Sequence, residues 1–292
     1  MREIVISTET NSDMSRDFLE KNGILVIPHY YNVEEKVYGE EGNLLTIKEF
    51  YDEMRAGKKV GTAASNPAVI LEKFTELAKQ GKDILHISFS SGLSCGYQNI
   101  VNGANEVMEN YPECKIVVVD TLSASLGEGM MLQLAVERRA EGRSIEEIAE
   151  EVRALSAHIC IQFTVDDLEY LYRGGRLSKT SAILGTVIHL KPVLHVNDEG
   201  KLVALAKVRG RKKSLSTMLE NMEAKIGSYR DKEKQIFIGI LHGDCEEDAM
   251  LLKSMVQEKF GFDKILVEPI GPSIGAHSGP GTVGLVFLGD ER

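Results

Sequence analysis

The sequence has few cysteines and no long apolar run. Its four cysteines are scattered without a CxxC motif or a Cys/His ligand spacing, which argues against a structural zinc site and a disulfide framework. The longest apolar runs, such as KIVVVD and IFIGIL, fall well short of the ~20 residues that cross a bilayer. The opening MREIVIST resembles a strand and lacks the features of a signal peptide, so we expect a cytoplasmic protein without stable membrane insertion.

Clustered positive charge is also scarce. The net charge is −10, and because phosphate contacts need grouped Lys and Arg, we expect no nucleic-acid partner. Neither a P-loop nor a Rossmann G-x-G-x-x-G is present, which disfavours a nucleotide-binding protein. One basic run, KVRGRKK at 207–213, stands out. It fits either a solvated turn or a docking patch for an acidic partner.

The first half of the chain alternates between strand-like and helix-like segments. EIVIST, DILHISFS and KIVVVD predict strands, as does the whole run ILVIPHYYNV at 24–33. Amphipathic segments such as TIKEFYDEMRAGK and NPAVILEKFTELAKQG predict helices. Because strands separated by helices form parallel sheets covered on both faces, residues 1–155 predict a doubly wound α/β domain with a mainly parallel sheet.

The second half has a different pattern. PVLHVNDEG and LVALAKV predict a hairpin joined at the NDEG turn, with helices near 213–227 and 246–259. Residues 156–292 therefore predict a second α/β domain with a mixed sheet. No internal repeat or low-complexity linker separates the halves, so we expect them to pack closely with a ligand between them.

The segment GLSCG matches the G-x-S-x-G nucleophile elbow of α/β-hydrolases and lies between a predicted strand and a predicted helix. A hydrolase would use Ser94 as nucleophile, His277 or His242 as base, and Asp244 or Asp166 as the orienting acid. Short patterns of this kind also arise by chance, and no HGGG-like oxyanion loop stands upstream. The serine hydrolase is therefore kept as the alternative function.

The same stretch has a simpler interpretation as an anion site. SFSSGLSCG places Ser90, Ser91, Gly92 and Ser94 at the carboxyl end of a strand and the start of a helix. Hydroxyls and exposed backbone N–H groups at such a place bind a carboxylate or phosphate. Helix capping by these serines is the purely structural alternative.

Further polar residues occur at comparable places. Thr62 and Ser65, in VGTAASNP, precede a helix and fit caps or ligand donors. Arg173 and Arg176 flank the glycine pair of YRGGRLS, which fits a surface turn, ion pairs with the nearby DDLE, or guanidinium recognition of an anion. His277 lies in GPSIGAHSGPG, which has four glycines and two prolines. This composition predicts a tight loop whose backbone approaches a ligand, or a buried structural histidine.

Taken in chain order, TAASNP, SFSSGLSCGYQ, VVDTLSASLGEG, YLYRGGRLS, LKPVL and IGPSIGAHSGPGTVG resemble the DegV family of bacterial fatty-acid-binding proteins. The resemblance spans nearly the whole chain, and the ordered set is specific. It implies two α/β domains with a long-chain fatty acid in an apolar tunnel between them. It also implies a protein without catalytic activity or cofactor, which presents the ligand carboxylate to a separate ATP-dependent fatty acid kinase.

The resemblance assigns site residues position by position. Thr62 matches the family's carboxylate-binding threonine, and the serine stretch around Ser94 matches the family's S-S-G-L-S segment. His277 matches the histidine of the H-x-G-P-G loop, which implies that it donates to the carboxylate. The residues implied in carboxylate binding are Thr62, Ser91, Gly92, Ser94, Gly275 and His277.

Arg173 and Arg176 match the family's G-G-R motif at the rim, and Arg209 resembles the position implicated in kinase contact. Three segments depart from the family's pattern. Glu9-Thr10 replaces an acidic-Ser pair, the threonine motif is TAAS, and Cys95-Gly96 replaces the usual Gly-Thr. These departures touch the pocket rim, so the resemblance does not imply a preferred acyl chain.

Overall fold

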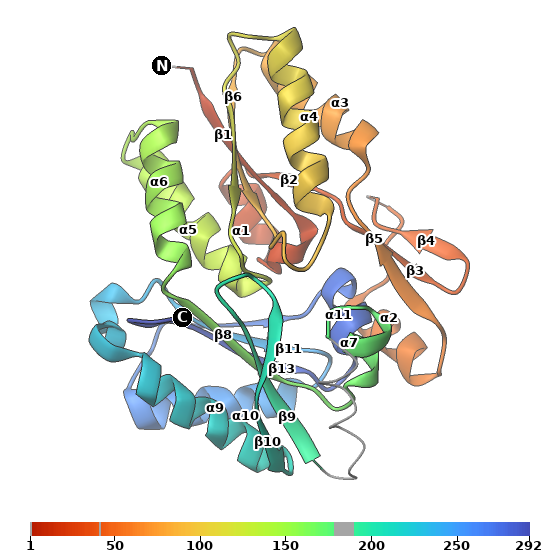
Figure 1. The fold of residues 1–292 in the computed structure, drawn as a ribbon, viewed down its shortest axis with the longest axis vertical. Helices are drawn as coiled ribbons and strands as arrows, with labels where there is room; N and C mark the ends of the chain where they lie inside the picture. Colours follow the sequence, from red (N-terminus) through yellow and green to blue (C-terminus); the bar gives the residue numbers. More distant parts are fainter. Residues whose placement is uncertain (1, 41, 178–189) are drawn as a thin grey trace.

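The computed structural model describes residues 2–40, 42–177 and 190–292 and contains two large sheets (Figure 1). The upper sheet in the view is parallel, with strand order β2-β1-β6-β7. Most of β1 and β6 is buried, as expected for parallel strands covered on both faces. The strands are β1 Ile4–Glu9, β2 Leu25–Ile27, β6 Asp83–Ser88 and β7 Ile116–Asp120.

The lower sheet is mixed, with strand order β10-β9-β8-β13-β11-β12. Only β11 and β12 pair in parallel; the other neighbours are antiparallel. The predicted α/β architecture of one parallel and one mixed sheet is confirmed, and we propose that the domain boundary expected near residue 155 lies between α6 and β8. The strands are β8 Ile159–Thr164, β9 Leu190–Val196, β10 Leu202–Arg209, β11 Ile238–His242, β12 Ile265–Pro269 and β13 Val283–Leu288.

A small antiparallel sheet, β4-β3-β5, was not predicted. The prediction of one strand over 24–33 is wrong, because β2 ends at Ile27 and the chain enters the small sheet after Pro28 and His29. Pro28 has no N–H to donate to a ladder, so the parallel sheet cannot continue through it. The break leaves His29 between two sheets. The new strands are β3 Tyr30–Val33, β4 Lys36–Tyr38 and β5 Val60–Ala63.

Local sequence signals start several of the helices. Thr46 and Glu49 form a capping box at α2, and Ser144 and Glu147 form another at α6. Pro67 occupies the first turn of α3, where its missing N–H costs nothing. The helices are α1 Arg16–Lys21, α2 Ile47–Arg55, α3 Pro67–Lys79, α4 Gly96–Asn110, α5 Leu126–Ala140, α6 Ile145–Ser156, α7 Glu169–Arg173, α9 Arg211–Lys225, α10 Glu246–Phe260 and α11 Pro272–Ser278, and the 3-10 turns are η1 Thr10–Ser12, η3 Gly227–Arg230 and η4 Lys232–Lys234.

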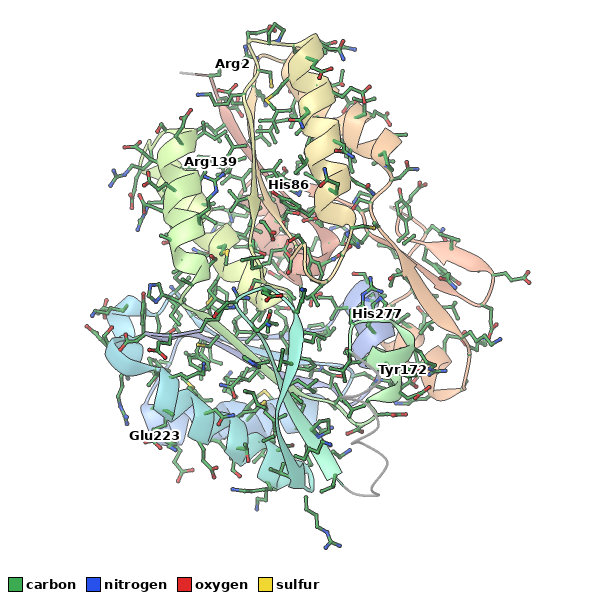
Figure 2. The ribbon with its side chains drawn as sticks, viewed as in Figure 1. Arg2, His86, Arg139, Tyr172, Glu223 and His277 are labelled. Atoms are coloured by element: carbon green, nitrogen blue, oxygen red, sulfur yellow. The ribbon has the colours of Figure 1, made fainter. Side chains whose placement is uncertain are left out.

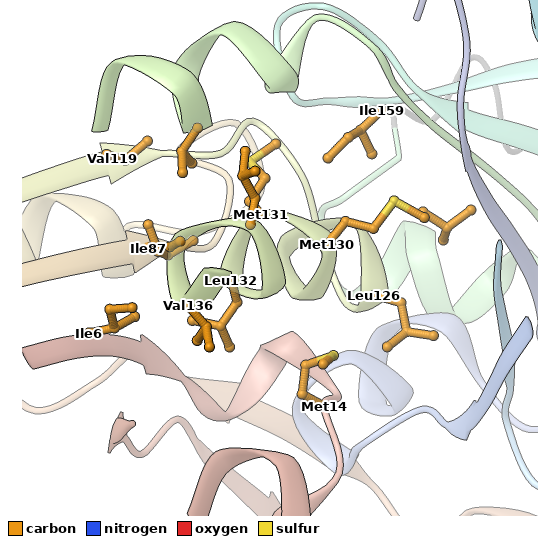
Figure 3. Close-up of a cluster of buried hydrophobic side chains, with 14 of the residues drawn as sticks. Ile6, Met14, Ile87, Val119, Leu126, Met130, Met131, Leu132, Val136 and Ile159 are labelled. Atoms are coloured by element: carbon orange, nitrogen blue, oxygen red, sulfur yellow. The ribbon is translucent and has the colours of Figure 1, made fainter. Parts of the chain in front are cut away.

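The helices form layers around the two sheets. Helices α3 and α4 cover one face of the parallel sheet, and α9 and α10 cover the outer face of the mixed sheet. Helix α5 lies between the sheets, and its side chains share one core with both (Figure 3). Among the helices of the described ranges, none combines the length and the apolar character needed to cross a membrane.

The segment GPSIGAHSGPG is a short helix rather than the predicted loop. Helix α11 begins after Gly271 with Pro272 in its first turn and ends at Gly279, which has a φ of 81°. Gly275 allows the helix to approach Tyr51, since a Cβ there would lie 2.5 Å from the tyrosine hydroxyl. The glycines therefore end a helix and let it pack closely, and His277 lies in its last turn.

Asp13 links the start of the chain to both α5 and α11. Its carboxylate accepts hydrogen bonds from Ser125 Oγ and, at 2.9 Å, from the Gly271 N–H. Burial raises the pKa of Asp13 to about 7, although both hydrogen bonds act to lower it. Asp13 therefore takes up a proton near neutral pH at a point where distant segments meet.

The raised pKa predicts a pH dependence of stability. The folded protein holds the Asp13 proton more tightly than the unfolded chain, so stability is lost as the pH rises from the usual Asp value of 3.8 to about 7. Asp13→Asn should remove this loss. The free energy of unfolding of the variant, relative to that of wild type, should therefore increase by at most about 4 kcal/mol as the pH rises over that range. Urea unfolding at several pH values measures the difference. The control is Asp17→Asn at an exposed position, and pH profiles of Asp13→Asn and wild type that run parallel contradict the prediction.

Candidate functional site

A cavity of about 340 Å³ lies where the two large sheets, the small sheet and α11 meet. Most of its wall is apolar and comes from strands of the mixed sheet and from the loops facing them. A wall of this kind favours an apolar ligand, because water in contact with it is released on binding. Representative apolar residues of the wall are Phe89, Ile161, Phe163, Val196, Leu241 and Ile274.

Four of the predicted site residues line this cavity together, although they come from four separate segments. Thr62 is on β5, Ser94 precedes α4, Arg176 follows α7, and His277 is on α11. Polar lining residues that were not predicted from the sequence are Asn11, His29, Ser125, Ser273, Ser278 and Thr282. Asn11 and His29 lie outside every motif of the sequence, whereas the other four lie within the motifs VVDTLSASLGEG and IGPSIGAHSGPGTVG but carry no signal that distinguishes them from their neighbours.

His277 is bonded to Thr62. Its Nε2 lies 2.7 Å from Thr62 Oγ1, while Nδ1 is buried and has no hydrogen-bond partner in the described part of the chain. Figure 2 shows the imidazole beside α7, and a Cβ on Gly174 would lie only 2.1 Å from Nδ1. Gly174 is thus required for the ring to fit. Burial, with the charge of Arg176 and nearby His29, lowers the pKa of His277 to about 4, so the ring is neutral at pH 7.

Arg176 connects the segments that carry the polar groups. Its Nε donates to the Leu93 carbonyl at 3.0 Å, and Nη1 donates to the Gly174 carbonyl. Within residues 2–40, 42–177 and 190–292, it forms no salt bridge with a carboxylate. A half-buried guanidinium that bonds only to carbonyls leaves positive charge at this end of the cavity. An anion bound there would be stabilised.

His29 and Ser94 are close neighbours in the wall. A Cβ on Gly96 would lie 2.9 Å from His29 Nε2 and 3.2 Å from Ser94 Oγ, so the two polar atoms lie close to the same point in space. The Gly96 N–H donates to Ser94 Oγ at 3.0 Å. The Cys95-Gly96 departure noted in the sequence thus has a structural correlate, because the His29 ring occupies the space that a side chain at position 96 would need.

Two buried carboxyl groups lie behind this wall: Glu9 on β1, near His86 (labelled in Figure 2), and Glu128 on α5. Glu9 accepts from Ser88 Oγ at 3.0 Å, and its Oε2 lies 3.3 Å from His86 Nε2. Burial alone would raise the pKa of Glu9, but the contact with His86 holds it below its usual value. Burial and the charge of Glu9 raise the pKa of Glu128 well above its usual value. One carboxyl is therefore ionised and the other protonated.

The other residues predicted for carboxylate binding lie outside the cavity wall. Ser91 is exposed, and its N–H donates to Asp120 Oδ1 at 3.2 Å. Gly92 packs against the Glu199 carbonyl, which lies 2.5 Å from the position of a Cβ. Gly275 packs against Tyr51, as described above. These positions shape the loop that carries Ser94 and the helix α11 that carries His277.

The remaining predicted arginines are on the surface. Arg173 lies over the Tyr170 ring, 5.3 Å from its centroid, and its Nε lies 3.7 Å from Glu169 Oε1. Arg209 is exposed at the end of β10. Neither residue lines the cavity. Ser178 of the YRGGRLS segment lies outside the described residues.

The triad required by the hydrolase alternative is not assembled. His277 Nε2 is bonded to Thr62 rather than to Ser94. Asp244 pairs with Arg55, and together with His242 it lines a separate, open pocket. Across the part of the chain that the structure describes, no group of three or more His, Cys, Asp and Glu side chains could hold a metal ion.

Comparison with known proteins gives consistent matches over the whole chain. The model of the DegV family matches residues 3–290. A DegV domain-containing protein of Clostridium perfringens is 38% identical, and the alignment covers 100% of this chain and 99% of that protein.

Solved structures show the same architecture. A structure described as fatty acid binding of a DegV family protein from Thermus thermophilus has a TM-score of 0.86 at 29% identity, covering 99% of this chain and 100% of that one. A fatty acid binding DegV family protein from Streptococcus agalactiae has a TM-score of 0.85 at 26% identity, with full coverage of both chains. The match of the family model to residues 3–290 and the 38% identity over the whole chain show that this chain belongs to the DegV family.

Proposed function

We propose that this protein binds a long-chain fatty acid in the cavity between its sheets, with the carboxylate at the end that carries Arg176. The observation that carries the proposal is an apolar cavity that ends beside a cation with no carboxylate partner in the described residues. A ligand that satisfies both features has a long apolar tail and a single negative charge. The Thermus thermophilus and Streptococcus agalactiae relatives, described as fatty acid binding, support this choice.

The carboxylate contacts follow from the bond between His277 and Thr62. Because His277 Nε2 is already bonded to Thr62 Oγ1, we propose that the imidazole donates to this oxygen and so directs the threonine hydroxyl toward the carboxylate. Ser94 Oγ donates a second hydrogen bond to the carboxylate, and Arg176 balances the negative charge. His277 thus acts mainly through Thr62, which differs from the direct donation that the family resemblance implies.

Affinity comes mainly from the acyl chain. Each buried methylene contributes about 0.8 kcal/mol, so a long chain supplies more than about 10 kcal/mol before the entropic cost of binding. The polar contacts exchange bonds with water for bonds with protein and add about 0.5–3 kcal/mol each. They therefore determine the orientation of the ligand more than its affinity.

We further propose that the protein has no catalytic activity of its own and presents the carboxylate to an ATP-dependent fatty acid kinase in the cytoplasm. The exposed positions of Arg173 and Arg209 are compatible with contact to such a partner. Positive charge on a protein surface speeds association with an acidic partner.

Native mass spectrometry of the freshly purified protein tests the ligand class directly. We expect a mass increment equal to one fatty acid, which disappears after organic extraction. The extract identifies the acyl chains taken from the host. A protein that stays at its apo mass after incubation with oleic acid contradicts the proposal. In that case, labelling of Ser94 by a fluorophosphonate would support the hydrolase alternative.

Two adjacent glycines provide a matched pair of variants. Gly174→Ala should push the His277 ring away from Thr62, because the new Cβ would lie 2.1 Å from Nδ1, while the local φ of −70° suits alanine. We expect its affinity for oleic acid to fall up to about tenfold, because the Thr62 hydroxyl loses the hydrogen bond from His277 that orients it toward the carboxylate. Isothermal titration calorimetry measures this affinity.

Gly175→Ala is the control. Position 175 has a φ of +72° and no atom within 4 Å of a new Cβ, so alanine should cost about 1 kcal/mol of stability and leave ligand affinity unchanged. Equal affinities for both variants would show that the position of His277 does not matter for binding.

Presentation to the kinase can be separated from acyl retention. His277→Ala should slow acyl-phosphate formation by the kinase more than it lowers fatty acid affinity, because the apolar contacts remain. Arg209→Glu should reduce transfer about tenfold through slower association and should leave fatty acid affinity unchanged. Phosphate transfer from labelled ATP measures both variants, and wild-type transfer rates would refute these roles.

A further inference from the structure

His29 is a buried residue of the cavity wall that neither the sequence motifs nor the family resemblance assigned to the site. Its side chain is 6% exposed. Its Nε2 is buried and has no hydrogen-bond partner in the ranges that the structure describes. A buried polar atom without a partner costs about 1–3 kcal/mol, so such an atom in a ligand cavity points to a missing bond with the ligand.

The hydrogen bonds around His29 assign its proton. Ser273 Oγ donates to Asn11 Oδ1 at 3.1 Å, which orients the Asn11 amide. The amide nitrogen of Asn11 then donates to His29 Nδ1 at 3.4 Å. Because Nδ1 accepts, the proton of the neutral ring is on Nε2. The atom without a partner is therefore a donor.

The position of this donor matches the proposed head-group site. Nε2 of His29 and Oγ of Ser94 both lie within 3.2 Å of the point that a Cβ on Gly96 would occupy. Gly96 has no side chain, so nothing of its own stands between them. A carboxylate oxygen that reaches Ser94 Oγ is thus also within reach of the imidazole N–H.

Burial keeps the His29 ring neutral, although one neighbouring charge opposes this. Three groups act on it: Glu9 from β1 favours the charged form, while Arg176 and His86 oppose it. Burial is the largest effect and lowers the pKa of His29. A neutral N–H donor adds no charge beside Arg176, and it still forms a charge-assisted bond with an anion.

We propose that His29 donates its Nε2–H to the carboxylate of the bound fatty acid, as a further donor beside Thr62 and Ser94. This inference rests on the proposed fatty acid function. It makes His29 a residue that selects the acid over an uncharged molecule with the same tail. Its contact with the Phe89 ring, with centroids 6.4 Å apart, holds the imidazole in place.

Two substitutions separate donation from packing. His29→Phe keeps an aromatic ring in the wall and removes both nitrogens. His29→Gln carries an amide N–H close to the position of Nε2. We expect His29→Phe to lower the affinity for oleic acid about 10- to 100-fold, the value of a hydrogen bond to a charged group, and His29→Gln to stay within about threefold of wild type.

Oleyl alcohol is the matched ligand, since it has the same tail without the charge. We expect its affinity to change by less than about threefold in both variants. Calorimetric titration of both ligands gives the comparison. If His29→Phe weakens acid and alcohol equally, or weakens neither, His29 only packs in the wall and the proposal is overturned. If the wild-type protein binds neither oleic acid nor oleyl alcohol, the proposed fatty acid binding is itself wrong.

A measurement on the wild-type protein guards against variants that fold poorly. In protein labelled with ¹⁵N-histidine, oleic acid should shift the Nε2 resonance of His29, and oleyl alcohol should shift it much less. The His29→Gln spectrum identifies the resonance by its absence. An Nε2 resonance that oleic acid leaves unchanged overturns the proposal.

Discussion

The burial of α5 between the two large sheets is the constraint on which the rest of the structure depends. Nearly every residue from Leu126 to Val136 is buried, and the helix shares one core with both sheets. The mostly apolar first three turns of this helix are covered on all sides, so the two halves cannot separate without exposing them. The residues just before it, Ala124 and Ser125, line the cavity. The ligand site therefore lies at one end of the shared core.

The polar end of the cavity is stabilised only in part by the protein itself. His277 Nδ1 and His29 Nε2 are buried without partners in the described residues, and Arg176 bonds only to carbonyls there. His277 Nδ1 carries no proton when Nε2 donates to Thr62, so it does not pair with an anion. His29 Nε2 and Arg176 both carry protons, so an anion that pairs with them recovers free energy that the empty protein loses. The tail contributes most of the affinity, whereas these groups decide which end of the ligand lies where.

Much of the architecture could be predicted from the sequence, because strand and helix periodicities and capping residues are local signals. The parallel sheet, the hairpin at NDEG and helices such as α2 and α6 follow from them. The break at Pro28-His29 and the helix over GPSIGAHSGPG were missed. In the first case an apolar run crosses from one sheet to another, and in the second tertiary packing against Tyr51 outweighs the low helix propensity of glycine.

The residues of the candidate site also divide into those that local sequence motifs mark and those that only the fold brings into place. Thr62, Ser94, Arg176 and His277 could be chosen because motifs mark them, and the fold brings all four to one cavity. His29 could not be chosen, since its role depends on Gly96, which is distant in sequence. Glu9 stood out only as a departure from the family's pattern expected at the rim, whereas the structure buries it against His86, outside the cavity wall. No local pattern encodes a contact of this kind.

The most direct test of the whole account is a crystal structure of the protein with oleic acid. We predict that the acyl chain lies in the cavity beside Phe163 and Leu241, with the carboxylate within hydrogen-bond distance of Thr62 Oγ1 and Ser94 Oγ. A carboxylate bound away from Arg176, or a ligand bound outside this cavity, would contradict it.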